Sequence, residues 1–258
     1  MTPLFAWLAG AASGLAGGAL SGLFGIGGGI VLVPLLGLAL HLNQHHAQGV
    51  TLAAMLLPIG LPAVIHYRRE GVPLDWGLVA MIVIGFLVGV YLGSLTANLI
   101  PERPLRWGFV AFLIVMAVKL LMEQRGGAAP HDAVGGAKFR SGLGLAIGLA
   151  GGVLSGLLGI GGGVVIIPAL MWGLGQNQRE AQLTSLAVML PPIGLPGVLV
   201  YAKAQHGLPW MLLLGVAVGF AAGAYLGARG GVRLPLSRLR KAFAGLLMVT
   251  ALLLAFKA

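Results

Sequence analysis

Residues 17–29 read GGALSGLFGIGGG, and residues 151–163 repeat this stretch as GGVLSGLLGIGGG, 134 residues further along the chain. In each copy an apolar, helix-like run reaches a cluster of glycines and then resumes as a second apolar run, which ends near Leu40 or Leu174. The second run is shorter than the ~20 residues that a membrane-spanning helix needs. The chain therefore consists of two related halves, and each half opens with a helix that glycines interrupt.

The composition indicates whether these helices lie in water or in a membrane. Of the 258 residues, 58% are hydrophobic and only 9% are charged, and the mean hydropathy is +0.98, whereas about one-quarter of a soluble domain is charged. The 44 glycines and 14 prolines suit membrane helices, in which backbones approach closely and neighbouring groups satisfy freed hydrogen-bonding atoms. The sequence predicts an all-α polytopic membrane protein in contact with the lipid bilayer.

The charged residues and the lack of cysteine exclude several other kinds of site. The net charge of +10 does not indicate nucleic-acid binding, because the basic residues stand in short loops, where they set membrane orientation. Without cysteine there is no disulfide and no thiolate metal site. His45 and His46 are a poor metal site, since their counterparts in the second half are Arg179 and Glu180. We expect no metal, cofactor or nucleic-acid partner, while a homo-oligomer is compatible with the sequence.

Landmarks at the constant offset divide the chain into an N-terminal transmembrane repeat (1–122), a cytoplasmic linker (123–140) and a C-terminal transmembrane repeat (141–258). Each repeat is expected to contain a glycine-broken helical hairpin and about three spanning helices. Polar patches, 41–48 and 176–182, follow the broken hairpins. The later apolar segments are Val50–Ile65, Trp76–Ala97 and Trp107–Met122 in the first half, and Thr184–Tyr201, Pro209–Ala228 and Leu234–Phe256 in the second.

The distribution of Lys and Arg among the loops favours one topology. If each broken segment doubles back, the two halves are inverted, and eleven basic residues collect on one side of the membrane against four on the other. If the broken segment crosses once, the counts are seven and eight, which carry no orientation signal. The sequence thus predicts two inverted repeats with both termini outside. Inverted repeats with broken helices are typical of secondary transporters, whose sites lie near the bilayer midplane.

A longer pattern surrounds both glycine clusters. The run Ser-Gly-Leu-x-Gly-Ile-Gly-Gly-Gly starts at Ser21 and at Ser155, and in both halves four aliphatic residues and a proline, Pro34 or Pro168, follow it. This duplicated pattern, in halves that span nearly the whole chain, resembles the TauE/SafE family of membrane exporters, which is associated with sulfite and organosulfonates. The resemblance implies a transporter and not an enzyme. It also implies outward transport of a small sulfur-containing anion across the plasma or inner membrane of a prokaryote.

The glycine turns also suit an anion by their own chemistry. Consecutive backbone N–H groups of such a turn can point into one concavity, and the following helix N-terminus adds a partial positive charge. Hairpins that enter from opposite sides would bring both turns together near the midplane, with serine hydroxyls one turn before them. The alternative is that the glycines only allow helices to pack closely. The turn residues predicted to bind substrate are Ser21, Gly25, Gly27, Gly28, Gly29, Ser155, Gly159, Gly161, Gly162 and Gly163.

The proline-broken run in each half is a second candidate for the site. Pro58 and Pro192 remove backbone donors and free carbonyl groups, and Thr51 and Ser185 lie upstream, where they can line the same cavity. The run is either a kinked gate beside the site or a permanently bent scaffold helix. Asn43 and Asn177 are interpreted first as turn and capping residues and second as a polar lining at a cavity mouth, a possibility that Gln48 and Gln182 share. The remaining glycine stripes, Gly85/Gly89/Gly93 and Gly219/Gly223/Gly227, are assigned to helix packing.

The absence of acidic residues from the apolar segments bears on the energy source for transport. All six acidic residues fall in predicted loops, so the sequence shows no intramembrane proton relay, and it contains no phosphate-binding ATPase motif. A potential that is negative inside favours anion exit by ~2.3 kcal/mol per charge per 100 mV. We expect an alternating-access exporter. The alternatives are an anion channel on the same scaffold, an uptake permease for another small anion, or a membrane enzyme or assembly subunit, although no intramembrane nucleophile and base are paired.

Overall fold

A computed structural model describes residues 2–24, 29–56, 61–122, 136–205, 207–231 and 236–256, and these residues form twelve α-helices and no strand. The first half contains α1 (Pro3–Phe24), α2 (Gly29–Ala39), α3 (Gln44–Ala54), α4 (Leu61–Arg69), α5 (Trp76–Leu99) and α6 (Glu102–Met122). The second half contains α7 (Ala137–Leu158), α8 (Gly163–Leu174), α9 (Gln178–Val188), α10 (Leu195–Ala204), α11 (Trp210–Gly231) and α12 (Leu236–Phe256). The two halves have the same order of helices, and the predicted all-α fold is confirmed.

Each half opens with a long helix and a short helix that pack against each other. Both α1 and α7 have 22 residues, whereas α2 and α8 have 11 and 12. A Cβ atom added at Gly17 of α1 would lie 2.8 Å from Cδ2 of Leu32 in α2. The counterpart Gly151 of α7 approaches Cγ1 of Ile166 in α8 at 3.3 Å. Since the short helix returns along the long one, the glycine-broken segments double back, as the sequence predicts.

The long helices account for the candidate membrane spans. Among the described residues, four helices are long and apolar enough to cross a membrane, and these are α1, α5, α7 and α11. Shorter apolar helices are α8, α10 and residues 244–256 within α12. This combination of long and short apolar helices is the architecture of a multi-pass membrane protein.

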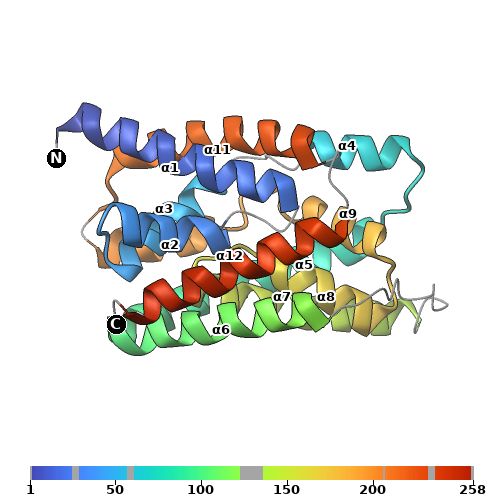
Figure 1. Cartoon of the computed structure of the whole chain (residues 1–258). Helices are drawn as coiled ribbons and strands as arrows, with labels where there is room; N and C mark the ends of the chain where they lie inside the picture. Colours follow the sequence, from blue (N-terminus) through green and yellow to red (C-terminus); the bar gives the residue numbers. More distant parts are fainter. Residues whose placement is uncertain are drawn as a thin grey trace.

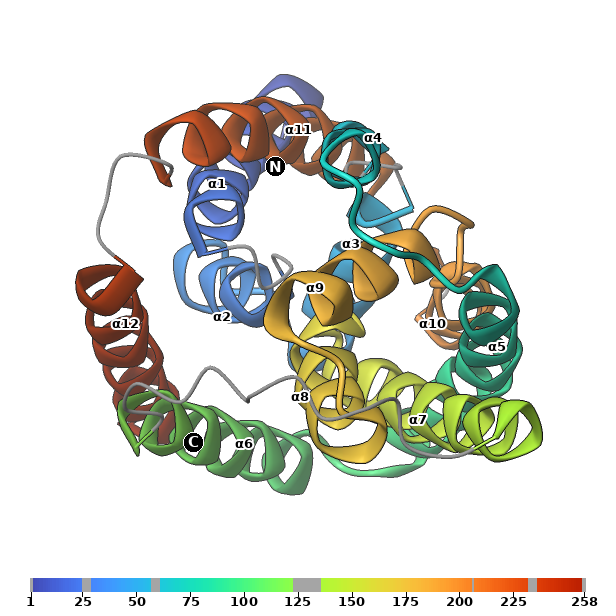
Figure 2. The same cartoon turned by 90° about the vertical axis from the view of Figure 1, so that its right-hand side faces the viewer.

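Three helix pairs lie on the outside of the molecule, and each pair takes one helix from each half. α1 packs along α11, α5 along α7 and α6 along α12, while α2, α3, α8 and α9 lie among these pairs (Figure 2). A Cβ atom at Gly14 of α1 would overlap the carbonyl oxygen of Val216 in α11. Their counterparts in the other pair, Gly148 and Ile82, overlap in the same way. A Cβ atom at any of the six glycines in the predicted stripes of α5 and α11 would likewise overlap a carbonyl oxygen of the partner helix, so the predicted packing role of these stripes is confirmed.

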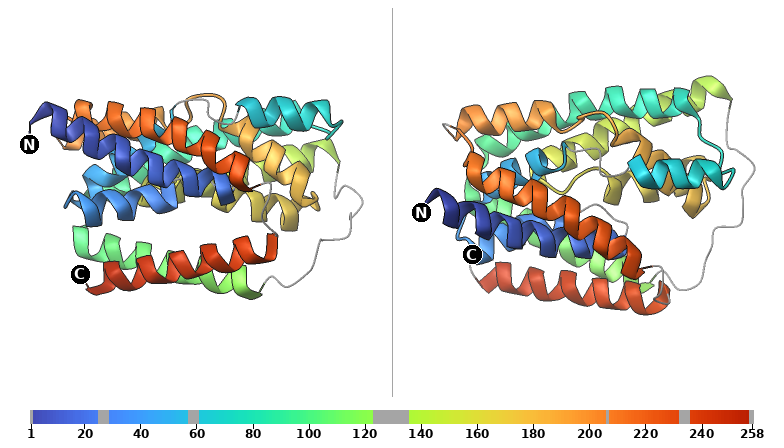
Figure 3. Two further views of the ribbon diagram at one scale, coloured as in Figure 1. Left: turned by 45° about the horizontal axis from the view of Figure 1, so that its top comes forward. Right: turned by 90° about the horizontal axis from the view of Figure 1, so that it is seen from above.

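The counterpart helices α6 and α12 run in opposite directions. They lie side by side and are antiparallel, and α1 begins at the end of the molecule where α12 ends (Figures 1 and 3). An inverted repeat would produce this relation. The orientation of each half in a membrane, and the side on which the termini lie, stay predictions.

Each polar patch runs from a short loop into the first turns of a helix, α3 or α9. Both α3 and α9 begin one residue after an asparagine, and the side chains of Asn43 and Asn177 accept the backbone N–H of His46 and Glu180. A side-chain oxygen at this position satisfies one of the free N–H groups of the first turn. The predicted capping role of the two asparagines is thereby confirmed.

The proline-broken run of the second half forms two short helices instead of one bent helix. α9 ends at its C-cap, Met189, and α10 begins at Leu195, whose N–H donates to the carbonyl oxygen of Pro192 over 2.9 Å. Consecutive prolines at 191 and 192 lack the N–H groups that would continue α9. The corresponding Pro58 lies outside the described residues.

Candidate functional site

The two helix breaks contact each other through their backbones. A Cβ atom at Gly29, the first residue of α2, would overlap the carbonyl group of Ile160, which lies in the break between α7 and α8. Only glycine permits this approach, because any side chain would push the two breaks apart. Gly29 and Ile160 are buried. The predicted site residues Gly25, Gly27 and Gly28 lie outside the described residues, as does the side chain of Ser21.

The second glycine turn is a tight, buried loop. Gly159 ends α7 with φ = 68° and donates its N–H to the carbonyl oxygen of Ser155 over 2.8 Å, and Gly161 has φ = 73°. These left-handed conformations favour glycine strongly. Gly162 caps α8 without any side-chain hydrogen bond. Among the described residues, no hydrogen bond satisfies the backbone N–H groups of Gly161, Gly162 and Gly163.

One face of α3 lies along this turn. A Cβ atom at Gly159 would lie 2.8 Å from Cα of Gln48, and one at Gly161 would lie 2.9 Å from Sδ of Met55. Thr51 stands between these two residues at helical spacing, so it shares their face. Thr51 is 0% exposed and Ser155 is 1% exposed, and within the described residues neither hydroxyl has a hydrogen-bond partner. The predicted residues of α3 and α7 thus place two buried, unsatisfied hydroxyls next to the turn.

Gln48 and Tyr201 complete this side of the turn. The sequence alone did not predict that these two side chains would meet. Nε2 of Gln48 donates to the carbonyl oxygen of Leu157 over 2.8 Å. The hydroxyl of Tyr201, in α10, lies 2.8 Å from Oε1 of Gln48 and 2.7 Å from the carbonyl oxygen of Gly156. The last carbonyl groups of a helix have no partner within that helix. Gln48 and Tyr201 therefore satisfy the end of α7 at the point where the chain enters the turn.

The other half repeats this contact. The hydroxyl of Tyr67, in α4, donates to Oε1 of Gln182, in α9, over 3.1 Å. Tyr67 and Gln182 stand 134 residues from Tyr201 and Gln48. A comparison of the halves at this offset would have found the tyrosine pair, but both tyrosines stand near the polar ends of apolar runs, where an interfacial tyrosine is common.

The remaining predicted site residues have different surroundings. Ser185, the counterpart of Thr51, is 2% exposed. Gly163 is buried at the start of α8. Pro192 is exposed in the break between α9 and α10. The described residues therefore bring together the second turn, Thr51 and Ser155, whereas Pro192 belongs to a turn on the surface.

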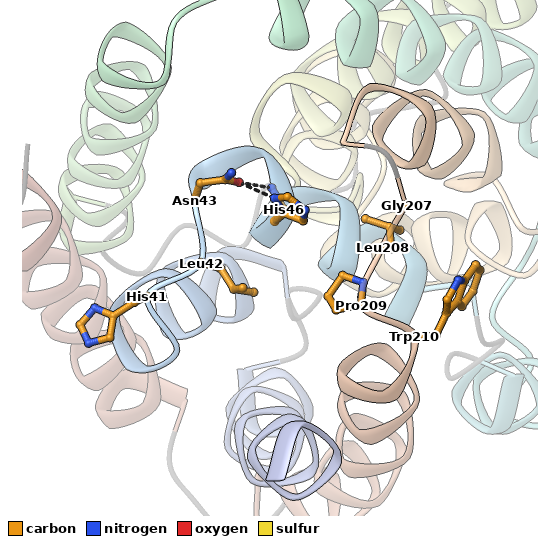
Figure 4. Close-up of a pocket in the computed structure, with 8 residues that line it drawn as sticks. All are labelled: His41, Leu42, Asn43, His46, Gly207, Leu208, Pro209 and Trp210. Atoms are coloured by element: carbon orange, nitrogen blue, oxygen red, sulfur yellow. Dashed lines mark hydrogen bonds between the residues drawn. The ribbon is translucent and has the colours of Figure 1, made fainter. Parts of the chain in front are cut away.

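A separate cavity lies at the end of the molecule where α3 begins. It has a volume of about 680 Å³, and Figure 4 shows the hydrogen bonds between Asn43 and His46 on its wall. His46 is partly buried, and burial, followed by the neighbouring His45, lowers the pKa of its imidazole. The cavity is lined by His41, Leu42, Asn43, His46, Gly207, Leu208, Pro209 and Trp210. None of these residues belongs to the glycine turns.

A charged group at the same end connects α6 to α3. Oε1 of Glu102 accepts the backbone N–H of Gln44 over 3.0 Å and lies 2.7 Å from the guanidinium of Arg106. Burial opposes ionisation of Glu102, but the Gln44 N–H and Arg106 outweigh it and lower the pKa of this carboxyl. Nε2 of His45 donates to the carbonyl oxygen of Ala97 over 2.9 Å.

Within the described residues, no three His, Cys, Asp or Glu side chains are grouped as a metal site would require.

Comparison with known proteins identifies relatives along most of the chain. Residues 10–254 match the family described as "Sulfite exporter TauE/SafE". The "Probable membrane transporter protein YdhB" of Bacillus subtilis is 31% identical over 216 residues, which are 82% of this chain and 85% of that protein. A "Probable membrane transporter protein" of Haemophilus influenzae is 27% identical over 93% of this chain and 94% of its own length. One from Xylella fastidiosa is 30% identical over 83% of this chain and 80% of its length. No solved structure matches the chain.

Proposed function

The chain belongs to the TauE/SafE family of membrane transporters, and from this premise we propose that it exports a small sulfur-containing anion, sulfite or an organosulfonate. The chain is a membrane transporter and not an enzyme. The proposed substrate site is the space between the two glycine-rich helix breaks. Transport would proceed by alternating access, with the two halves as inverted repeats.

The observation that carries this proposal is the contact between Gly29 and Ile160, which brings the two breaks together. Beside that contact stand three consecutive glycines whose N–H groups have no partner among the described residues, at the N-terminus of α8. Turns of this kind bind anions because several N–H dipoles and the helix terminus favour negative charge. The hydroxyls of Thr51 and Ser155 can add two donors.

In this conformation the second turn fits closely against neighbouring side chains. Gln48, Met55 and Phe86 contact Gly159, Gly161 and Gly162 in turn. Met55 and Phe86 contact the glycines through side chains, which can change rotamer when an anion enters.

Export itself needs no proton if the membrane potential drives it, at ~2.3 kcal/mol per charge per 100 mV. The four acidic residues of the described chain, Glu70, Asp75, Glu102 and Glu180, all lie at helix ends.

The first test measures the thermal stability of the purified protein with sulfite, thiosulfate, sulfate, sulfoacetate, taurine and acetate. An anion at 100 times its dissociation constant raises the free energy of unfolding by ~2.7 kcal/mol. Thr51→Val and Ser155→Ala should weaken the binding of that anion by ~10-fold to ~100-fold, because each removes a hydrogen bond to a charged group. Thr96→Val is the matched control, since the exposed Thr96 hydroxyl bonds to its own helix at Leu92.

The second test follows flux into proteoliposomes that contain the purified protein. A transporter gives saturable flux and counterflow of the anion that stabilised the protein, and an interior-positive potential should increase anion uptake. If no anion changes the unfolding temperature, or if Thr51→Val and Ser155→Ala respond as the unchanged protein does, the glycine turns are packing contacts. Flux that neither saturates nor shows counterflow would identify an anion channel.

A further inference from the structure

The two Gln–Tyr hydrogen bonds connect the halves of the molecule in a reciprocal way. Gln48 is in the first half and Tyr201 in the second, whereas Gln182 is in the second half and Tyr67 in the first. α3 lies toward the end where α1 begins, and α4 and α9 lie toward the other end (Figure 1). The two bonds therefore occupy opposite ends of the central group of helices.

The two bonds are not in the same state. Tyr201 and Gln48 are both 0% exposed, and their bond is 2.8 Å long. Tyr67 and Gln182 are only half-buried, and their bond is 3.1 Å long. Because the residues are related by the repeat, equal surroundings are the expectation, and the difference reports an asymmetry of the conformation. The end at Tyr201 is sealed more tightly than the end at Tyr67.

The Tyr201 hydroxyl can release Gln48 without losing its own hydrogen bond. It carries one hydrogen, yet two acceptor oxygens lie within hydrogen-bond distance, one on Gln48 and one on the Gly156 backbone. Gly156 and Tyr201 belong to the same half, whereas Gln48 belongs to the other. If the halves move apart at this end, the hydroxyl keeps the Gly156 carbonyl as its acceptor. The bond between the halves can therefore break without leaving the Tyr201 hydroxyl unsatisfied.

The position of Gln48 connects this bond to the site. Its Cα and Cβ atoms are within 2.9 Å of the place where a Cβ at Gly159 would stand, so it forms part of the wall of the second glycine turn. We propose that Tyr201 with Gln48, the first gate, and Tyr67 with Gln182, the second gate, close the path to the glycine turns from opposite ends in alternation. The first gate is shut in this conformation. This inference depends on the proposed transport function.

The lack of cysteine in the chain allows a direct test of the gates. Ser155→Cys places one thiol at the second turn, and the negatively charged, membrane-impermeant reagent sulfonatoethyl methanethiosulfonate is added to one side of sealed vesicles. Right-side-out and inverted vesicles expose opposite ends of the protein, and a tag fused after the last residue identifies the end at which α12 terminates. In Ser155→Cys alone, the thiol should react faster from the end of the second gate than from the end of the first.

The gate variants should then change the two rates in opposite directions. Tyr201→Phe should increase labelling from the end of the first gate by ~5-fold and decrease it from the other end, the factor expected for one neutral hydrogen bond. Tyr67→Phe should do the reverse. Tyr91→Phe and Tyr225→Phe are matched controls, because this second repeat-related pair lies at exposed positions. Both controls should leave the two rates unchanged.

Labelling requires only a folded protein, so the gates can be judged separately from the substrate. An unchanged elution profile and unfolding temperature identify variants that fold normally. Folded Phe variants that change both rates in the same direction, or change neither, would overturn the gates even if an anion binds. Opposite changes in a protein that responds to no anion would support the gates and reject the proposed substrate class.

Discussion

The outer helix pairs and the central helices of this protein are held together by different atoms. In the pairs α1–α11 and α5–α7, glycines face backbone carbonyl groups at every turn, so the contact is made by main chain against main chain. In the centre, α2, α3, α8 and α9 have 11 or 12 residues, and beside the main-chain contact of Gly29 with Ile160 stand the side chains of Gln48, Met55 and Tyr201 and the unsatisfied hydroxyl of Thr51. A contact between main-chain atoms leaves two helices a single relative position, whereas a contact between side chains can adjust by a change of rotamer. We therefore expect the pairs α1–α11 and α5–α7 to form a rigid frame around a more mobile centre.

The lipid environment explains why the frame uses glycine. Between membrane helices there is no hydrophobic driving force, and close van der Waals packing of small residues takes its place. A side chain on either helix separates the backbones and removes many contacts together. The frame should therefore be the most sensitive part of the molecule to a single added methyl group.

The largest expected effect is the loss of folded protein in Gly89→Ala. The added Cβ would overlap the carbonyl oxygen of Leu149 in α7, and the counterpart change Gly223→Ala would overlap that of Leu15 in α1. Overpacking costs about 1–3 kcal/mol of unfolding free energy and occasionally more, and a backbone neighbour cannot rotate away. Unfolding temperature and size-exclusion profile in detergent measure the effect.

Gly108→Ala is the matched control for the frame. It makes the same substitution within a helix, α6, but no atom lies within 4 Å of the added Cβ. Its stability should be unchanged or higher by up to ~1 kcal/mol, the helix preference of alanine over glycine. Equal losses in Gly89→Ala and Gly108→Ala would contradict the main-chain contact as the source of rigidity.

A smaller effect is expected in the centre, for Gly159→Ala. Its left-handed φ of 68° costs an alanine ~1–2 kcal/mol, and Gln48 must also move. The variant should fold less stably and should lose the thermal response to the anion that stabilises the unchanged protein. Gly71→Ala, with φ = 79° and no atom within 4 Å, separates the two causes, because it has the strain without the contact. A normal anion response in Gly159→Ala would place the binding site elsewhere.

The smallest effect concerns the carboxyl group of Glu102, which connects the outer helix α6 to α3 in the centre. Since the pKa of Glu102 is lowered in the folded protein, its contribution to stability is present above the ordinary value of 4.5 and is lost as the pH falls through the lowered value. The partly exposed ion pair with Arg106 limits this contribution to ~1 kcal/mol or less. Below that ordinary value, the unfolding temperature of the unchanged protein should fall more steeply than that of Glu102→Gln. Parallel pH profiles would show that the contact is not a link between α3 and α6.

Much of the frame could be read from the sequence, because its causes are local. Composition identified the membrane, the spacing of Gly85, Gly89 and Gly93 identified a packing face, and Asn43 and Asn177 identified helix starts. The doubling back of the broken segments followed from the basic residues of the loops. A glycine face predicts a close neighbour but does not name it, so the pairing of α5 with α7 needed the structure.

The polar part of the site was harder to predict for a physical reason. Gln48 was predicted only as part of a polar patch that could line a cavity mouth, yet it is completely buried in α3, where the end of α7 offers it a carbonyl acceptor. This carbonyl group belongs to the other half of the chain, so the residues around Gln48 give no indication of it. The complete break between α9 and α10 was also not evident, since a proline either kinks or ends a helix. The sequence predictions for Gly25, Gly27, Gly28 and Pro58 fall outside the described residues.

The reciprocal pairing of α1 with α11 and of α5 with α7 has an evolutionary consequence. α11 is the counterpart of α5, and α7 is the counterpart of α1, so each half offers the other the same pair of surfaces. Two identical half-length chains related by a two-fold axis would make these contacts twice, as in an isologous dimer. Duplication and fusion of the gene for such a half-length chain would account for both pairs of contacts.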